Sequence, residues 1–403
     1  MAVGLKPPGD LQQIAGIRLA SVHSGIKSDA KAKDLVLIEI NDDASVASVF
    51  TRNRFCAAPV TIARQHLALN PTPRYLLINS GNANAGTGDV GIQHAVASCR
   101  AVADATAVSV SEVLPFSTGV IATELPLGCI EKAVPGLLDK LDRDHWLQAA
   151  EGIMTTDTLA KAVSAQLQIH NQTVSITGIA KGSGMIKPNM ATMLSFIATD
   201  AQIETAELES LLGQMVSKSF NSITVDGDTS TNDACVLIAT GGNGVPVSCS
   251  DNDFVEALQG VFQQLAQSII RDAEGATKYV EIEVQQAASV SDAREVAYCI
   301  AHSPLVKTAL FASDPNWGRI LAAVGRANIE NLDIDGVDLY LGNTCLLKRG
   351  LPDPDYREEL GQAEMDSEEI RILVKLNQGS DSATIWTSDL SYEYVKINAE
   401  YRS

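Results

Sequence analysis

The stretch KGSGMIKPNMATML, residues 181–194, places a candidate nucleophile, Thr192, after the small residue Ala191 and a Pro-Asn turn. A threonine hydroxyl is a weak nucleophile and needs an adjacent base. Scission of the peptide bond before Thr192 supplies that base, because the new α-amine has a pKa of about 7.7 to 8.0 and takes up the hydroxyl proton near neutral pH. The stretch therefore predicts self-cleavage between Ala191 and Thr192, with no histidine required.

Strand-like and helical patterns alternate on both sides of Thr192. Short apolar runs predict strands, and apolar residues at three- and four-residue spacing predict helices. The expected strands cover 36–40, 75–78, 174–179 and 194–198, and the expected helices cover 93–107, 145–154, 208–216 and 254–270. This mixture predicts a layered α/β fold in which the chain before and after Thr192 contributes to one body.

The sequence towards the C-terminus predicts that a sheet continues to the end of the chain. Val280, Ile282 and Val284 alternate with acidic residues, and apolar residues alternate in the same way over 370–376. Alternation of this kind indicates half-buried strands with one face in solvent. Residues 351–366 are rich in Pro, Asp and Glu and are predicted to form an exposed loop.

Composition limits the class of protein. The chain has 403 residues, enough for two domains, and 45% of them are hydrophobic. Asp and Glu outnumber Lys and Arg by 49 to 30, and the net charge of −19 disfavours binding to nucleic acid and anionic membranes. No apolar run reaches the roughly 18 residues of a membrane helix, and the N-terminus has neither a secretory signal nor a transit-peptide pattern. We expect a soluble cytoplasmic protein.

Cysteine and histidine positions predict no metal site. The seven cysteines are scattered and include no C-x-x-C pair, which indicates reduced thiols, mostly in the core, rather than a disulfide framework or a zinc cluster. The six histidines are also dispersed and form no H-E-x-x-H motif.

Two further motifs suggest ligands that their spacing does not favour. Residues 86–91, GTGDVG, match the G-x-G-x-x-G of dinucleotide sites, but the motif begins well beyond the expected strand rather than in a tight turn, so a plain glycine-rich loop is favoured. Asp226, Asp228 and Asp233 suggest a cation. The EF-hand pattern is incomplete, however, and the Ser and Thr residues between the aspartates are typical of a tight turn.

Residues 181–194 resemble the processing and active-site segment of the ornithine acetyltransferase family, also called glutamate N-acetyltransferases, the bifunctional acetyltransferases of arginine biosynthesis. Six other segments resemble the same family: NSGNANA at 79–85, TGVI at 118–121, TTDT at 155–158, DGDTSTND at 226–233, DPNWGR at 314–319 and NAEYRS at 398–403. The resemblance implies an α-β-β-α sandwich with a second, smaller α/β domain. It also implies cleavage into fragments 1–191 and 192–403, which stay associated and pair into a heterotetramer of two copies of each fragment.

The resemblance assigns roles to individual residues. Thr118 and Gly119, which by themselves are typical of an ordinary turn, match the pair that stabilises the tetrahedral intermediate, and Ala122 stands where the family commonly has another glycine. The family's substrate-binding positions match Thr155 or Thr156, Lys181, Thr192, Glu274, Asn398 and Ser403. These residue types suit the chemistry, since lysine, hydroxyl and amide groups bind a carboxylate and a glutamate binds an ornithine ammonium. Trp317, within DPNWGR, is expected to pack, with no chemical role.

The resemblance also implies a reaction. Thr192 attacks the acetyl carbonyl of N2-acetylornithine, ornithine leaves, and glutamate accepts the acetyl group from acetyl-Thr192 in a ping-pong sequence. No cofactor is implied; some family members use acetyl-CoA as the donor, and the sequence does not separate the two kinds. Two alternatives stay open, an N-terminal-threonine amidase or aminopeptidase in which water accepts the acyl group, and a non-catalytic dinucleotide-binding regulator that uses residues 86–91.

Overall fold

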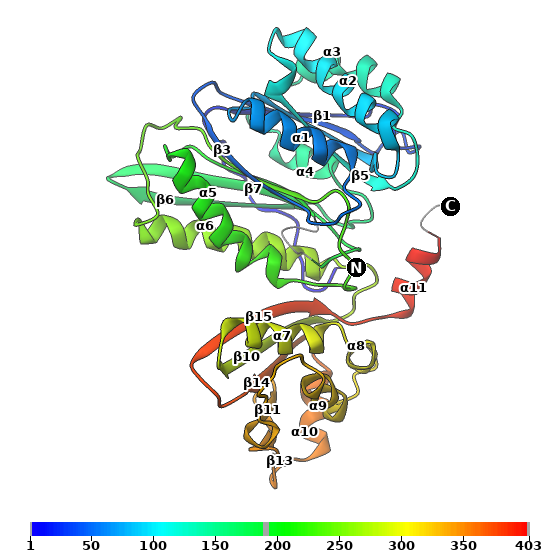
Figure 1. Cartoon of the computed structure of the whole chain (residues 1–403), viewed down its shortest axis with the longest axis vertical. Helices are drawn as coiled ribbons and strands as arrows, with labels where there is room; N and C mark the ends of the chain where they lie inside the picture. Colours follow the sequence, from blue (N-terminus) through cyan, green and yellow to red (C-terminus); the bar gives the residue numbers. More distant parts are fainter. Residues whose placement is uncertain (1, 188–192, 401–403) are drawn as a thin grey trace. The chain divides into compact units, whose positions relative to one another are not determined.

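The computed structural model describes residues 2–187 and 193–400, and the chain divides into two compact units (Figure 1). The larger unit comprises Lys6–Asn221 and Thr229–Ile269. The smaller unit comprises Met1–Leu5, Ser222–Asp228 and Ile270–Ser403. The smaller unit is thus built mainly from the last third of the chain, and the described residues on both sides of 188–192 belong to the larger unit.

Two sheets form the centre of the larger unit. The first has the order β1 (Ile17–Val22), β2 (Leu35–Ile40), β4 (Tyr75–Asn82) and β5 (Val113–Val120). The second has the order β3 (Ser45–Phe50), β9 (Ala234–Ala239), β8 (Leu194–Thr199), β7 (Gln172–Lys181) and β6 (Lys161–Ile169). In the first sheet β4 and β5 are parallel, and in the second β8 and β9 are parallel while β7 pairs with β8 antiparallel.

The two sheets pack face to face. Along β2, Val36 and Ile38 belong to the apolar cluster that also contains Leu194 and Phe196 of β8, because alternate side chains of a strand point to opposite faces. Phe116 and Phe196 meet edge to face across this interface with ring centroids 5.1 Å apart, a geometry worth about 0.5 to 1.5 kcal/mol beyond the buried area. The strands on either side of Thr192 therefore share one core with the N-terminal sheet.

Helices cover the outer faces of both sheets (Figure 1). On the first sheet, Leu35 and Leu37 point away from the second sheet into a cluster with residues of α1, α2 and α3. On the second sheet, Leu265 of α6 lies against Gly178 of β7. The helices of the larger unit are α1 (Ala58–Leu69), α2 (Gly88–Thr106), α3 (Leu127–Leu138), α4 (Trp146–Gly152), α5 (Thr205–Ser217) and α6 (Asn252–Arg271). The predicted α-β-β-α layering is confirmed.

The smaller unit has its own sheet and core. Its strand order is β13 (Leu351–Pro352), β12 (Thr344–Lys348), β11 (Asp338–Leu341), β14 (Glu369–Lys375), β10 (Tyr279–Ala287) and β15 (Asp381–Ser388). Its helices are α7 (Val290–Ala301), α8 (Pro304–Phe311), α9 (Trp317–Gly325), α10 (Glu358–Met365) and α11 (Tyr392–Ala399). Val280, Ile282 and Val284 are buried and the acidic residues between them are half-buried, as their alternation predicted.

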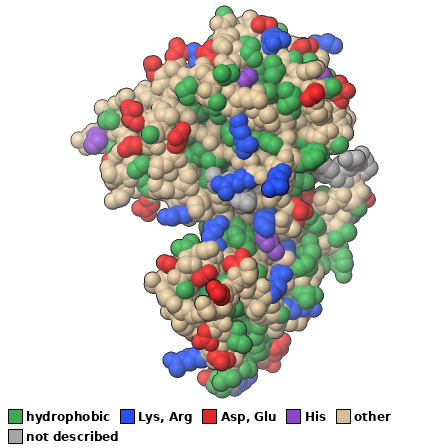
Figure 2. All heavy atoms as spheres, viewed as in Figure 1, with side chains coloured by type: hydrophobic (Ala, Val, Ile, Leu, Met, Phe, Trp, Pro, Cys, Tyr) green, Lys and Arg blue, Asp and Glu red, His purple; other side chains and the backbone are tan. Residues whose placement is uncertain are grey.

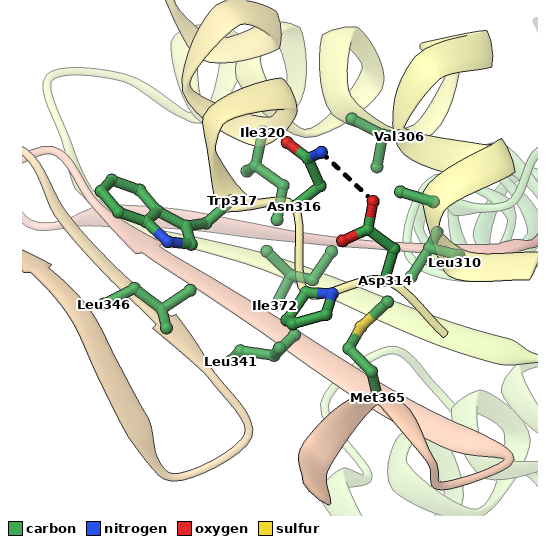
Figure 3. A pocket seen from close by; sticks show the side chains of 12 residues that line it. Val306, Leu310, Asp314, Asn316, Trp317, Ile320, Leu341, Leu346, Met365 and Ile372 are labelled. Carbon is green, nitrogen blue, oxygen red and sulfur yellow. Dashed lines mark hydrogen bonds between the residues drawn. The ribbon is translucent and has the colours of Figure 1, made fainter. Parts of the chain in front are cut away.

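The DPNWGR segment leads into α9, and Trp317 packs as expected (Figure 3). Its ring meets Tyr356 edge to face at 6.3 Å between centroids. Asn316 Nδ2 donates to Asp314 Oδ2 at 3.2 Å, beside an apolar cavity of about 10 Å³. A cavity of that size has room for about one water molecule, so this segment supports the core of the smaller unit.

Several details differ from the sequence prediction. Residues 351–366 are not a loop throughout, because α10 occupies Glu358–Met365 and buries Met365 in the core of the smaller unit. Strand β4 extends to Asn82, beyond the predicted end at residue 78. All seven cysteines are free thiols, yet Cys99 and Cys235 alone are buried and the other five are half-buried, so the prediction of mostly core thiols was wrong.

The surface and the helices carry further information on the class of protein. Figure 2 shows Asp and Glu side chains distributed over this face of both units with Lys and Arg among them. Within residues 2–187 and 193–400, every helix is too short or too polar to cross a bilayer. In the same residues, His, Cys, Asp and Glu side chains form no group arranged to hold a metal ion.

Candidate active site

Thr118 and Gly119 lie at the carboxyl end of β5, beside the matching end of β4. The strands are parallel and pair Gly81 with Gly119. Gly119 has a φ of +132°, and a Cβ atom there would lie 2.3 Å from the carbonyl carbon of Gly81. Only glycine fits this close approach of two backbones. Ligands of open α/β sheets bind outside the carboxyl ends of such strands.

The turn after Gly119 holds Ala122 in a left-handed conformation. Ala122 adopts the left-handed φ of +60° that a glycine would take without strain, and its N–H donates to Ala85 O at 2.8 Å. The left-handed conformation costs an alanine about 1 to 2 kcal/mol, which the hydrogen bonds of the loop must outweigh.

Lys181, the last residue of β7, reaches the Thr118 side chain. Its Nζ donates to Thr118 Oγ1 at 3.2 Å, and each residue is only 9% exposed. Because the lysine donates, Thr118 Oγ1 accepts, and the hydroxyl proton of Thr118 is left to donate to another group. The backbone of Lys181 pairs with Leu194 at the start of β8. Two residues that the resemblance selected from distant segments are therefore in contact.

Asp157 is a residue that the sequence prediction missed, and it joins two of the predicted substrate-binding segments. Its Oδ1 accepts from Lys161 Nζ at 2.7 Å and from Gly182 N at 2.8 Å, while its Oδ2 accepts from Thr155 N at 3.0 Å. The side chains of Asp157 and Lys161 are fully buried. We call Thr118, Asp157, Lys161 and Lys181 the Lys181 cluster.

The charged groups of the Lys181 cluster shift the pKa values of neighbouring groups. Burial by itself would raise the pKa of Asp157, but the adjacent Lys161 and Lys181 ammonium groups hold that pKa well below its usual range. Burial lowers the pKa of Lys27, whose Nζ donates to Met154 O at 2.8 Å, and the positive charge of Lys181 acts in the same direction. A motif of the form T-T-D could have identified Asp157, because an aspartate commonly accepts from the backbone of neighbouring residues.

Glu274 and Asn398 belong to the smaller unit and contact each other. Asn398 Nδ2 donates to Glu274 Oε2 at 2.8 Å, and Glu274 is 7% exposed. The helix that carries Asn398, α11, is fixed by Ser391 Oγ, which donates to Gly275 O at 2.6 Å, and by Tyr394 OH, which donates to Asp226 Oδ2 at 3.1 Å. We call Asp226, Glu274, Tyr394 and Asn398 the Glu274 cluster.

A buried lysine lies in the same unit as the Glu274 cluster. Lys307 Nζ donates to Thr387 Oγ1 at 3.0 Å and to Ser388 O. Burial lowers the pKa of Lys307 to about 8, against the opposing effect of the Asp389 and Asp226 carboxylates. Asp389 itself accepts from Thr277 N and Thr277 Oγ1, which fixes the chain that follows Glu274.

Asp226 and Asp228 form a tight turn, and the glycine-rich motif does not. Asp228 N donates to Asp226 Oδ1 at 3.1 Å, as in the predicted tight turn. The motif at 86–91 overlaps the start of α2 at Gly88, and Gly86 lies four residues after the end of β4 rather than in a tight turn. The strand after α2, β5, is parallel to β4 and had not been recognised in the sequence. Ala191, Thr192 and Ser403 lie outside the described residues.

Comparisons with known proteins agree on one family. Residues 18–403 match the profile of the ArgJ family. An arginine biosynthesis bifunctional protein ArgJ of Pseudomonas syringae pv. tomato is 51% identical over 408 positions, covering 100% of both chains. The protein of the same name from Methylococcus capsulatus is 52% identical over 97% of this chain and 96% of its own.

A solved structure extends the comparison to three dimensions. The crystal structure of arginine biosynthesis bifunctional protein ArgJ from Bacillus halodurans has 40% sequence identity and a TM-score of 0.50, covering 52% of this chain and 99% of that chain. With the profile match over nearly the whole sequence, these similarities show that the chain belongs to the ArgJ family.

Proposed function

We propose that this arginine-biosynthesis acetyltransferase transfers the acetyl group of N2-acetylornithine to glutamate through an acetyl-Thr192 intermediate. Membership of the ArgJ family supports the activity, and the contact between Lys181 Nζ and Thr118 Oγ1 supports the assignment of these residues to the active site. In this proposal the chain cuts itself between Ala191 and Thr192, and the fragments 1–191 and 192–403 remain associated in a cytoplasmic heterotetramer. The α-amine that the cut releases on Thr192 serves as the base for its own hydroxyl.

Each group then has a role in the transfer. Thr118 and Gly119 stabilise the negatively charged oxygen of the tetrahedral intermediate, and the donation from Lys181 to Thr118 Oγ1 directs the Thr118 proton elsewhere, as that role requires. Lys181 and the hydroxyl of Thr155 or Thr156 bind the substrate α-carboxylate. Glu274, oriented by Asn398, binds the ornithine ammonium. Ser403 supplies a further hydroxyl to the substrate.

Association of the two fragments after cleavage has a physical basis in the larger unit. Strand β7 ends at Lys181 and strand β8 begins at Leu194, and the two strands pair antiparallel between Ile176–Lys181 and Leu194–Thr199. Their side chains contribute to the apolar cluster between the sheets. Breaking one peptide bond leaves this buried surface unchanged, so the fragments are expected to remain together.

Intact mass spectrometry of the purified protein tests the proposal. We expect fragments of 191 and 212 residues, with the second beginning Thr-Met-Leu-Ser, and acetylation of that second fragment after incubation with acetylornithine. Thr192→Ala should remain one chain without activity. Thr173→Ala, the same change at an exposed position of β7, should be cut and active. A fully active single chain would contradict the proposal.

Substrate assays separate the remaining alternatives. Acetylglutamate formed from acetylornithine and glutamate supports the transferase, whereas acetate without acetylglutamate indicates the amidase alternative. The relatives are named bifunctional, so acetyl-CoA with glutamate is the second donor to test: acetylglutamate from this pair makes the present chain bifunctional. Calorimetry with NAD and NADP tests the dinucleotide alternative, and binding of either would support it.

A further inference from the structure

The proposed function leaves the reacting nitrogen without a partner in the protein. Lys181 meets the carboxylate, Glu274 meets the side-chain ammonium, and Thr118 with Gly119 meets the oxyanion. Each half-reaction also makes or consumes an α-amine, and at neutral pH that amine gains a proton when it leaves and must lose one before it attacks. A group that stores this proton would serve both half-reactions.

Asp233 has the placement of such a group. The residue lies immediately before β9 and is 3% exposed. Its Oδ2 is buried and, within the described part of the chain, has no hydrogen-bond partner. Buried polar atoms in folded proteins are nearly always hydrogen-bonded, so a carboxyl oxygen without a partner requires an explanation.

The backbone around Asp233 is fixed by its neighbours on both sheets. Asp233 O accepts from Thr51 N at 2.9 Å, and Ala234 N donates to Met193 O at 3.0 Å, so the residue lies beside the chain that directly follows Thr192. Asn232 Nδ2 donates to Ser117 O at 2.9 Å, next to Thr118. Through its neighbours Asn232 and Ala234, Asp233 is held beside β5, the strand that carries Thr118 and Gly119, and beside the start of β8.

Electrostatics indicate which form of the acid is present. Burial raises the pKa of Asp233 well above its usual range, and this effect exceeds the opposing effects of a hydrogen bond from Ser230 and of the positive charge of Lys181. Lys181 is the ammonium that acts on Asp233, and it acts on Asp157 and Lys27 as well. Such surroundings favour the protonated form of a carboxyl group, which can donate its proton.

We propose that Asp233 is the proton store for the reacting nitrogen: it protonates the amine that leaves and deprotonates the ammonium that arrives. When the C–N bond of acetylornithine breaks, the hydroxyl proton of Thr192 passes through its α-amine to the nitrogen, and the Asp233 proton completes the ornithine ammonium. The arriving glutamate ammonium gives one proton to the Asp233 carboxylate. The neutral amine then attacks the acetyl carbon, and a second N–H proton returns through the α-amine to Thr192 Oγ.

Asp233→Asn tests the proposal, because the amide has the shape of a protonated carboxyl group but cannot release its proton. We expect acetyl-Thr192 to form from acetylornithine about 100-fold or more slowly, the usual scale of general acid catalysis. With p-nitrophenyl acetate, whose leaving group needs no proton, the rate should stay close to that of the wild type. The glutamate half-reaction should recover as the pH is raised, because the amine then arrives without its extra proton.

Asp200→Asn is the matched control. Asp200 is 8% exposed, its pKa is also raised by burial, and it follows the far end of β8. That end lies about 20 Å along the strand from Leu194, at about 3.3 Å per residue. This variant should match the wild type with both donors and at each pH. Thermal melting and intact mass verify that both variants are folded and cut before the kinetic measurements.

The outcomes separate this inference from the function on which it rests. Wild-type protein that forms no acetyl-Thr192 from either donor would remove the proposed function and the inference together. If the wild type reacts, Asp233→Asn with normal rates from acetylornithine overturns only the inference, and so does an equal loss with both donors, which indicates a structural role. A folded Asp233→Asn chain that never cuts would also overturn it, because Asp233 would then serve scission and not transfer.

Discussion

The Lys181 cluster and the Glu274 cluster hold their polar groups by different means. In the Lys181 cluster the side chains come from strand ends and from a loop clamped by the buried Asp157–Lys161 ion pair. In the Glu274 cluster they come from a turn and from α11, a helix without a buried residue. One cluster is fixed by charge in the core, whereas the other joins the buried Glu274 to the exposed Asn398 through a hydrogen bond.

This difference suits a site for two amino acids. Acetylornithine and glutamate share the α-carboxylate and the reacting nitrogen but differ in the charge of the side chain. In the proposed function the shared atoms bind to the Lys181 cluster, where rigid placement aids reaction because it lowers the entropy lost in reaching the transition state. In the same proposal the side chain that differs binds to the Glu274 cluster, which is held by hydrogen bonds of Asn398 and Tyr394. Variants in each cluster should therefore fail in different ways.

Asp157→Ala should have the largest effect. The change leaves the Lys161 ammonium buried without its carboxylate and removes the acceptor for Gly182 N. Removal of one partner of a buried ion pair costs about 3 to 5 kcal/mol. We expect this loss in urea unfolding, together with a strong reduction of acetyl-Thr192 formation. Adding Lys161→Met should restore part of the stability, because no unpaired charge then remains; equal stability of the wild type and the single variant would contradict the role of the clamp.

The contrast also shows what the sequence could predict. The strand pattern of 194–198 and the apolar stripe of 208–216 correspond to β8 and α5, because their periodicity reflects burial on one face. Helix α10 was not predicted, because the Pro and Asp residues before it and the acidic residues within it are typical of a loop. The helix forms because Met365 packs in the core of the smaller unit. Helix α10 owes its stability to tertiary contacts that local composition does not record.

The same reasoning applies to the site. The resemblance selected Thr118 and Lys181, and the structure brings them into contact. Asp157 and Asp233 were not assigned to the site, because an aspartate beside Thr, Ser or Asn is typical of a turn. Both side chains are buried, Asp157 accepts from Gly182 N, which is distant in sequence, and Asp233 Oδ2 has no partner within the described residues. Interactions between distant segments are therefore the part of the site that periodicity and spacing could not supply.

Lys307→Met should have an effect of intermediate size on the free energy of unfolding, and this effect should depend on pH. Its pKa is about 8 in the folded protein and about 10.4 in an unfolded chain. Between these values the unfolded state binds more protons, so stability rises with pH by on the order of 3 kcal/mol. Below pH 8 Lys307 is protonated in both the folded and the unfolded state, so its titration no longer makes stability depend on pH. Lys307→Met should flatten the rise in the free energy of unfolding between pH 8 and 10, measured by urea unfolding. The variant also loses the hydrogen bonds to Thr387 and Ser388, but this destabilisation is the same at every pH and does not change the slope.

A second lysine variant is the control for Lys307→Met. Lys161→Met in the larger unit removes a lysine paired with a carboxylate, so it should leave the slope between pH 8 and 10 in place. Raised tyrosine pKa values, such as that of Tyr279 under burial, act with the opposite sign and only above about pH 10. A slope that survives Lys307→Met would show that another group causes it.

The smallest effect is expected for Tyr394→Phe, which removes one hydrogen bond to Asp226 and keeps the ring. A hydrogen bond of this kind contributes about 1 kcal/mol, so the melting temperature should change little. Asn398, four residues further along α11, then orients Glu274 less well, and the KM for acetylornithine should rise several-fold while kcat changes little. Tyr392→Phe, an exposed tyrosine of the same helix at 82% exposure, is the control. A fall in kcat with unchanged KM would mean that α11 takes part in the chemical step, and the division of labour between the two clusters would be wrong.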